Sequence, residues 1–162
     1  MNYNWRQANG TDVLPITQIA IDYFQKEIDN IFVPNPNAYN RNITLAIVNQ
    51  FYNPLSEFFS VATDSNNNII AYTWAKPKEY TPWSDEEILF VKMAHVNLDL
   101  PAKTRVKLIN DMLRMWETFA TLAKISIICS STMRRDQQAF LKLHEKHNYD
   151  IRGSYAYKKL SA

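Results

Sequence analysis

The stretch ILFVKMAHVNLDL, residues 88–100, decides the fold of this chain. It is a long run rich in apolar residues, which predicts a strand, and Pro101 follows it directly. A helical pattern covers residues 103–122, and KISIICSS at 124–131 predicts a short buried strand. Two strands joined by one helix predict a parallel crossover, because parallel neighbours need a long connection.

The other elements surround this unit. A short strand at 2–8 precedes a helix that Thr11 or Asp12 caps and that runs to about residue 32, and a second helix covers residues 38–51. EFFSVAT (57–63) and IIAYTWA (69–75), joined by DSNNN, predict an antiparallel hairpin. KPKEYTPWSDEE (76–87) indicates a polar connection, a last helix spans 134–146, and one or two strands end the chain over 149–160. The order predicts one α/β (α+β) domain over residues 1–162. Its mixed, mostly antiparallel sheet has six to seven strands, with helices on both faces.

The amino-acid composition limits the classes of protein to which this chain can belong. The 162 residues are 46% hydrophobic, enough for one domain with a sizeable core. A net charge of +2 is too small to predict nucleic acid or a membrane as the partner. The single cysteine, Cys129, excludes an intramolecular disulfide and a cysteine-rich metal site. With no charged-then-apolar leader and no apolar run near twenty residues, the sequence predicts a cytoplasmic protein.

The element order resembles the Gcn5-related N-acetyltransferase (GNAT) fold over nearly the whole chain. SVATDSNNNIIAYTWA resembles the family's hairpin, and MAHVNLDL resembles the strand that pairs with the pantetheine arm of acetyl-CoA. FLKLHEKHNYDIRGSYAYKKL resembles the final block of the family. The glycine-poor character, two residues in all, is similar to that of acetyltransferase-like proteins of tailed bacteriophages, which would place the chain in the host cytoplasm. The resemblance implies acetyl-CoA as cofactor and an amine of a small molecule or protein as acceptor.

The resemblance also implies a cofactor site along the long strand and the following helix start. Its expected members are Met93, His95, Val96, Leu98, Lys103, Thr104, Arg105 and Lys107. The family's pyrophosphate loop, Q/R-x-x-G-x-G/A, falls on Leu100, Lys103 and Arg105, so its glycines are absent. Glycine lets backbone N–H groups approach phosphate oxygens at a helix start. The basic cluster, Lys103 to Lys107, therefore has two interpretations. Either its side-chain cations replace that contact, or it is a solvated first helical turn whose side chains fill the position of the phosphate. Positive charge at the start of a helix is unfavourable because it opposes the helix dipole. The presence of the cluster therefore favours the interpretation in which an anion is bound.

Two histidines are the candidate catalytic residues. Strict alternation places His95 on one face with Val91, Met93 and Asn97, bordering the acceptor, where an imidazole can act as base. The alternative is a hydrogen-bonded core histidine. His144 takes the place of a tyrosine that often protonates the departing thiolate in the family; the alternative is a favourable charge near a helix C-terminus. HEKH at 144–147 lacks the i, i+4 spacing of a zinc helix, so no metal site is predicted.

Several polar and aromatic residues have two interpretations. Ser130, Ser131 and Thr132 line the cofactor opening or form a capping loop, and the aromatic residues around Trp74 line an acceptor pocket or belong to the core. Tyr80, Trp83 and their polar loop are expected at the surface. The sequence therefore predicts an acetyl-CoA-dependent N-acetyltransferase. The alternative is a GNAT fold that has lost its cofactor site and serves as an interaction or virion-associated protein, paired with itself or with another protein.

Overall fold

The computed structural model describes residues 2–28, 31–133, 137–153 and 156–159. In this part of the chain one sheet runs in the order β1-β2-β3-β4-β5. Its strands are β1 (Tyr3–Gln7), β2 (Phe58–Asp64), β3 (Ile69–Thr81), β4 (Ser84–Val96) and β5 (Ile127–Ser130). The first four pair antiparallel, and β5 lies parallel to β4, which confirms the predicted crossover.

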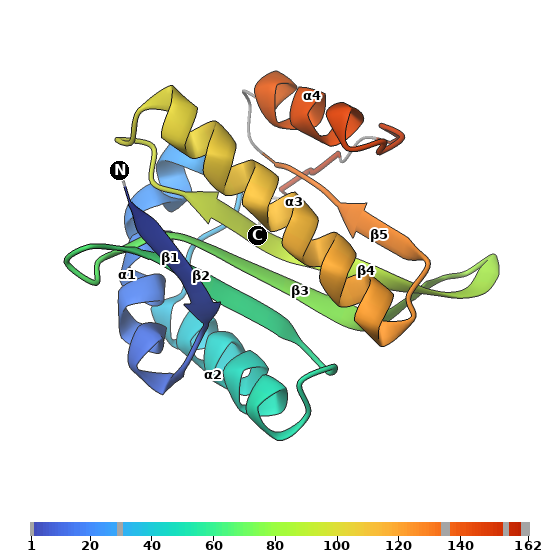
Figure 1. Ribbon diagram of the computed structural model, residues 1–162, viewed down its shortest axis with the longest axis horizontal. Coiled ribbons are helices and arrows are strands. Elements are labelled where there is room, and N and C mark those ends of the chain that lie inside the picture. Colours follow the sequence, from blue (N-terminus) through green and yellow to red (C-terminus); the bar gives the residue numbers. More distant parts are fainter. Residues whose placement is uncertain (1, 29–30, 134–136, 154–155, 160–162) are drawn as a thin grey trace.

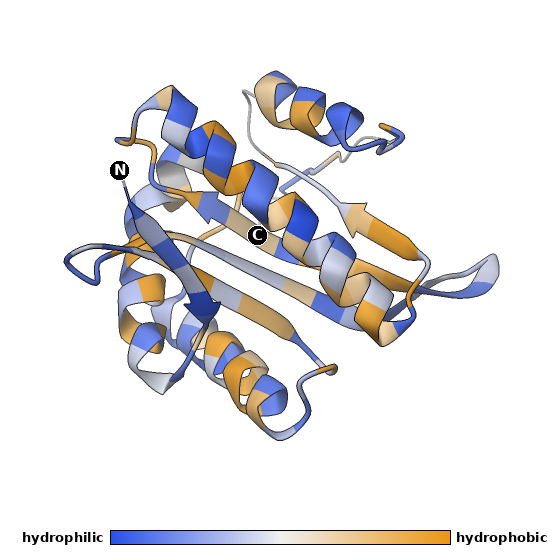
Figure 2. Cartoon of the chain, in the orientation of Figure 1, coloured by the Kyte–Doolittle hydropathy of each residue, from blue (hydrophilic) through white to orange (hydrophobic). Residues whose placement is uncertain are grey.

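Helices cover both faces of the sheet. Figure 1 shows α1 (Val13–Ile28) and α2 (Pro36–Tyr52) behind it, with α3 (Ala102–Ala123) and α4 (Gln138–Lys146) on the opposite face. Each face of the sheet has its own core. Figure 2 shows hydrophobic residues along the strands and on the helices that cover them. Ile16, Ile43 and Phe59 belong to the first core, while Met112 and Trp116 belong to the second. The predicted fold class, a mixed and mostly antiparallel sheet between helices, is confirmed.

The start of α1 is tied to the first strand by polar contacts. A short 3-10 turn, η1 (Gly10–Asp12), leads into α1, and the Asn9 side chain accepts a hydrogen bond from the Thr11 amide. The Asp12 carboxylate accepts from the Asn9 amide in return, which completes a capping box. The Arg6 guanidinium donates to both oxygens of Asp12 at 2.7 Å. Because Asp12 is buried, this ion pair fixes where α1 leaves the sheet.

The connection predicted at residues 76–87 is instead part of a long hairpin. β3 continues to Thr81 and β4 begins at Ser84, so the two strands extend well past the rest of the sheet (Figure 1). Pro77 is accommodated because β2 pairs with β3 only as far as Ala75, which leaves one side of β3 open there. Trp83 and Tyr80 lie near the tip and are 82% and 56% exposed, as predicted.

The prediction of six to seven strands was wrong for the described part of the chain, which has five. The difference lies at the C-terminus: residues 149–153 and 156–159 form no strand, and 154–155 and 160–162 lie outside the described residues. The first helix was also predicted too long, since α1 ends at Ile28 and residues 31–32 form a bend. Residues 134–136 of the predicted last helix lie outside the description. Among the described residues, no helix is both long enough and apolar enough to span a membrane.

Candidate active site

The central feature of the site is the point where β4 and β5 separate. Their pairing runs from Ile88 and Ile127 to Val91 and Ser130 and stops there. β4 continues to Val96, so its last five residues have no β5 partner in the described structure. A backbone edge without a strand partner can pair with a ligand that carries amides.

A β-bulge marks the same point on β4. Trp74 of β3 pairs with Met93, but the next residue, Ala75, pairs with Val91, which leaves Lys92 as the extra residue. Val91 therefore packs in the core beneath α3, whereas Met93 packs against the core beneath α1 and α2. The prediction that Val91 and Met93 share a face was wrong, because one inserted residue inverts the alternation.

A buried threonine holds the bulge in place. The Thr73 hydroxyl donates to the Met93 carbonyl at 3.0 Å and accepts from the Trp116 indole N–H at 3.0 Å. Thr73 and Trp116 are fully buried. The chain of two hydrogen bonds thus connects α3, β3 and the bulge of β4 through the core.

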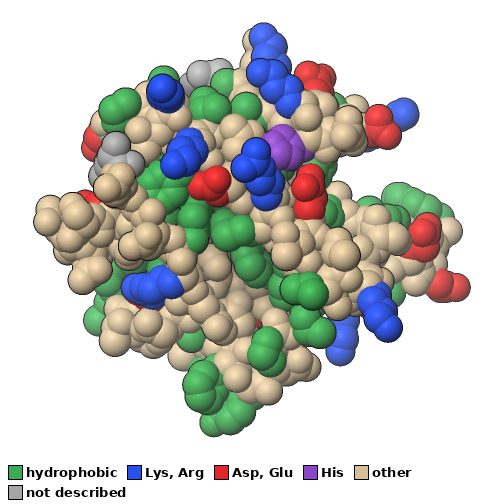
Figure 3. Space-filling view, viewed as in Figure 1, with side chains coloured by type: hydrophobic (Ala, Val, Ile, Leu, Met, Phe, Trp, Pro, Cys, Tyr) green, Lys and Arg blue, Asp and Glu red, His purple; other side chains and the backbone are tan. Residues whose placement is uncertain are grey.

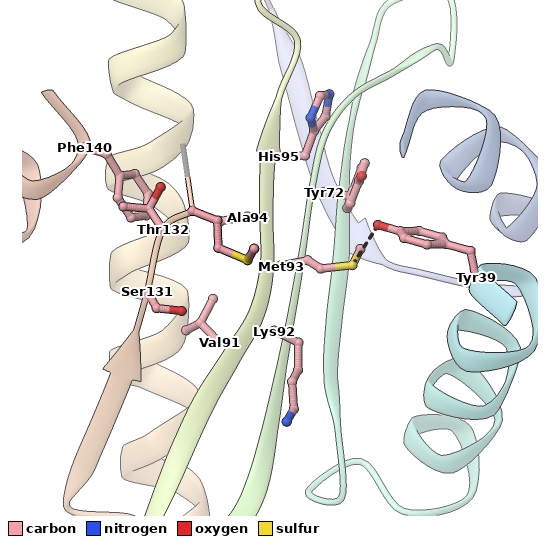
Figure 4. Close-up of a pocket in the computed structure, with 11 residues that line it drawn as sticks. Tyr39, Tyr72, Val91, Lys92, Met93, Ala94, His95, Ser131, Thr132 and Phe140 are labelled. Carbon is pink, nitrogen blue, oxygen red and sulfur yellow. Dashed lines mark hydrogen bonds between the residues drawn. The ribbon is translucent and has the colours of Figure 1, made fainter. Parts of the chain in front are cut away.

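A cavity of about 160 Å³ lies at this separation. Figure 4 shows Val91, Ser131, Thr132 and Phe140 on the side of β5 and α4. On the other side, Tyr39 of α2 and Tyr72 of β3 face β4. The two walls come from elements far apart in the sequence and meet only because β5 stops early.

His95 and Met93 are the two predicted site residues that line the cavity. The His95 ring, 5% exposed, lies almost parallel to the Tyr72 ring, with centroids 5.0 Å apart and an angle of 23°. The Tyr23 ring of α1 lies 5.3 Å from His95 on a tilted plane. Met93 receives a hydrogen bond from the Tyr39 hydroxyl to its sulfur at 2.9 Å. Two other predicted members do not line the cavity: the Val96 side chain packs in the core, and Leu98 lies in the turn after β4.

The basic residues at the start of α3 do not all lie on the same face of the helix. Lys103, Thr104 and Lys107 line a separate surface pocket beside Tyr3, and the Lys107 ammonium lies 4.9 Å from the Tyr3 ring centroid. Figure 3 shows lysine and arginine side chains on the exposed face over this helix, mixed with acidic ones. The three predicted residues therefore share a solvated face that does not line the β4–β5 cavity.

Arg105 differs from its neighbours. It lies three residues before the fully buried Leu108 and seven before Met112, so it is on the sheet-facing side of α3. The side chain is half-buried, and its Nε is buried without a hydrogen-bond partner among the described residues. The amides of Thr104 and Arg105 turn back to the Pro101 carbonyl at 2.9 and 3.1 Å, so only earlier amides of the turn lack an intrahelical acceptor. Arg105 is the one member of the cluster that combines a positive charge with an unmet hydrogen-bond donor.

His144 lies in the interface between α3 and α4. It is 2% exposed and contacts the rings of Phe140, Trp116 and Tyr149. Its Nδ1–H donates to the Phe140 carbonyl at 2.9 Å, and its Nε2 has no partner among the described residues. Burial lowers the pKa of His144, so the ring is neutral at pH 7. The cavity is lined by Phe140, one turn earlier on α4, rather than by His144.

Tyr39 is one of the lining residues that the sequence did not reveal. It belongs to the second helix, where no local signal distinguishes a core tyrosine from a pocket tyrosine. Ser131 and Thr132 do line the cavity, which was one of their two predicted roles. The described residues include no group of His, Cys, Asp and Glu suited to a metal ion.

Comparisons with known proteins agree with this geometry. No protein-family model and no curated protein sequence matches the chain. A predicted acetyltransferase from Clostridium acetobutylicum, solved with acetyl-CoA, superposes with a TM-score of 0.74 at 14% identity over 98% of this chain and 96% of that one. The aminoglycoside 6'-N-acetyltransferase AAC(6')-Ih from Acinetobacter baumannii gives 0.67 at 13% identity, covering 99% of each chain. Glucosamine-6-phosphate N-acetyltransferase from Arabidopsis thaliana gives 0.67 at 9% identity, over 99% and 100%. The chain has the fold of the GNAT acetyltransferases.

Proposed function

We propose that this protein is a GNAT-type N-acetyltransferase that binds acetyl-CoA between β4 and β5. The observation that carries the proposal is the end of β4 that lies beside the cavity and extends past its pairing with β5 in the described structure. The pantetheine arm contains two amides, so it can pair with β4 in the way that an added strand would. A similar structure from Clostridium acetobutylicum was solved with acetyl-CoA, which supports the same cofactor here.

The proposed reaction is direct transfer of the acetyl group to an amine. The amine nitrogen attacks the thioester carbonyl, while fixed N–H groups of β4 stabilise the developing negative charge on its oxygen. His95, which lines the cavity, takes the proton that the amine loses. Release of the CoA thiolate completes the transfer.

The acid role predicted for His144 stays a prediction. As placed, its Nδ1 proton is donated to the Phe140 carbonyl, so a proton for the thiolate would have to come from Nε2. That requires a protonated ring, which burial disfavours. The contacts of His144 favour a positioning role, in which the ring holds the last turns of α4 and thereby Phe140.

Arg105 is the proposed phosphate contact. A guanidinium can bind two phosphate oxygens at once, and the buried Nε of Arg105 lacks a partner in the described structure. Lys103 and Lys107 lie on the solvated face and contribute only long-range attraction. In this proposal the Arg105 side chain makes some of the hydrogen bonds to phosphate that backbone amides make in a glycine-rich loop.

The alternative is a GNAT fold without a cofactor, used for interaction with a second copy or another protein. The observation that favours it is the direction of Lys103, Thr104 and Lys107, which line a pocket away from the β4–β5 cavity. It predicts a stable complex by light scattering and no response to acetyl-CoA.

Thermal unfolding with acetyl-CoA separates the two functions. A ligand present at about 100 times its dissociation constant stabilises the folded state by about 2.7 kcal/mol. Ser131→Trp should abolish the shift because the indole fills the cavity, while the matched Ser131→Ala should keep it. No shift for the unmodified protein at millimolar acetyl-CoA would refute the enzyme and favour the alternative.

A second comparison tests the phosphate contact alone. Arg105→Met should weaken acetyl-CoA binding about 10- to 100-fold, the loss expected for a hydrogen bond to a charged group. It should leave binding of S-acetylpantetheine unchanged, because that ligand lacks the pyrophosphate. Lys103→Met serves as the matched control, with an expected change under about threefold. Equal losses for both ligands would show that Arg105 acts through the fold.

A further inference from the structure

The wall of the cavity on the side of α1 and α2 is aromatic. Tyr39, Tyr72 and His95 line it, and Figure 4 shows all three on the same side of β4 as Met93. The Tyr72 and His95 rings come from neighbouring strands and stack on each other, with their centroids 5.0 Å apart. Aromatic and thioether groups favour planar apolar partners, which they contact through ring faces and polarisable sulfur.

The described lining of the cavity offers no negative charge to compensate a second ammonium group. None of its described lining residues is Asp or Glu. Its one lysine, Lys92, forms an ion pair with Glu79 at 2.9 Å and lies 4.6 Å from the Phe90 ring centroid. Figure 4 shows the Lys92 ammonium pointing away from Met93 and His95. Asp99, which accepts a hydrogen bond from Tyr23 at 3.1 Å, is exposed in the turn after β4 and does not line the cavity.

The volume of the cavity limits the size of the acceptor group that can enter it. At about 160 Å³ it is close to the engineered 150 Å³ cavity that holds one benzene molecule. A single ring fits this space, whereas a second ammonium group brought into it would lose water without gaining a carboxylate partner.

We infer that the acceptor is a primary amine attached to one aromatic ring and carrying no second positive charge. This inference rests on the proposed N-acetyltransferase function and names the acceptor class of that same site. The ring of the acceptor packs against Tyr39 and Tyr72, and this contact directs the amine towards His95 and the thioester. The described lining has no acidic residue to pair with a second ammonium group, so polyamines and other multiply charged amines are expected to be poor acceptors.

The test measures CoA thiol release from acetyl-CoA with three amines. These are phenethylamine, the aliphatic n-hexylamine and the polycation spermine. The ring contact should give phenethylamine a kcat/KM about three- to tenfold above hexylamine, as expected for an aromatic pair. Spermine should be at least about tenfold poorer than phenethylamine, the effect of one unpaired charge in a desolvated site.

Variants at Tyr39 locate the ring contact. Tyr39→Leu should reduce the preference for phenethylamine over hexylamine to below about twofold, and Tyr39→Phe should recover most of it. The acetyl-CoA thermal shift is measured for each variant, so that an unfolded protein or a damaged cofactor site is recognised.

The outcomes separate this inference from the proposed function. If acetyl-CoA shifts the unfolding temperature and spermine is the better substrate, or none of the three amines reacts, the acceptor inference is overturned while cofactor binding stands. A preference for phenethylamine that survives Tyr39→Leu also overturns it. If no acetyl-CoA shift is seen, the proposed function fails and the inference fails with it.

Discussion

The hydroxyl of Thr73 should be worth several kcal/mol of stability, because two buried groups depend on it. It donates to the Met93 carbonyl and accepts from the Trp116 indole, both at 3.0 Å, and the side chain is fully buried. Thr73→Val keeps the shape of the side chain but removes both hydrogen bonds and leaves the buried indole N–H without its acceptor. At about 1–3 kcal/mol for the unsatisfied indole and about 1–2 kcal/mol for the lost bond to the carbonyl, the variant should lose about 2–5 kcal/mol.

Urea unfolding measures this loss of stability directly. The urea concentration at the midpoint should fall, while the dependence of the unfolding free energy on urea stays constant. The matched control is Thr73→Ser, which keeps the hydroxyl and loses one methyl group, at a cost of about 1 kcal/mol. A loss of 2–5 kcal/mol is a large share of a typical total stability of about 5–15 kcal/mol. Thr73→Val should also weaken acetyl-CoA binding, because Met93 lines the cavity and its carbonyl would no longer be fixed.

A double-mutant cycle tests the reasoning further. In a Trp116→Phe background the indole donor is gone, so Thr73→Val should cost at least about 1 kcal/mol less than in the unmodified chain. If Thr73→Val is as stable as Thr73→Ser, or if the cycle shows no coupling, the proposed role of the hydroxyl is wrong.

Two further stability measurements concern buried polar groups. Since burial lowers the pKa of His144, the unfolded chain binds its proton first, so stability is complete above about pH 6.5 and falls as the pH drops below that value. His144→Phe should flatten this fall in unfolding experiments from pH 7.5 to 5.5, and an unchanged slope would contradict a buried neutral ring. The Gln50 amide donates to the Phe59 carbonyl at 3.0 Å and accepts from the Phe59 amide. The Phe59 carbonyl also accepts from the Ala8 amide at 3.0 Å, so Gln50→Leu leaves only the Phe59 amide without its partner. The variant should therefore cost about 1–3 kcal/mol in urea, and no measurable loss would show that water replaces the bond to the amide.

The fold could be predicted from the sequence because the patterns that define its helices and strands are local. Periodicity identified the helices, and the order strand, helix, strand over residues 88–131 predicted the parallel pair. The long hairpin was missed because Pro77 and Pro82 indicate a loop. Whether a proline ends a strand depends on which neighbours need its N–H group, and only the register of β2 shows that none does at Pro77.

The site was readable only in part, for two different reasons. The bulge at Lys92 has no sequence signal in this chain, so alternation placed Val91 and Met93 on one face. The division of the basic cluster, by contrast, was encoded: Arg105 is three residues before Leu108, on the apolar stripe of α3, whereas Lys103 and Lys107 are not. Counting residues along the helix separates one half-buried arginine from two solvated lysines.

The scarcity of glycine weakens only one end of the proposed cofactor site. The pantetheine end relies on the backbone of β4, and that edge is exposed because β5 stops pairing at Ser130, whatever side chains β4 carries. The phosphate end relies on side chains, and among the described residues at the start of α3 the half-buried Arg105 is its proposed contact. Affinity should therefore come mainly from the pantetheine arm, so S-acetylpantetheine should retain most of the binding free energy of acetyl-CoA. In a glycine-rich loop more of the binding free energy would come from the pyrophosphate, because each exposed backbone amide adds a hydrogen bond to a phosphate oxygen.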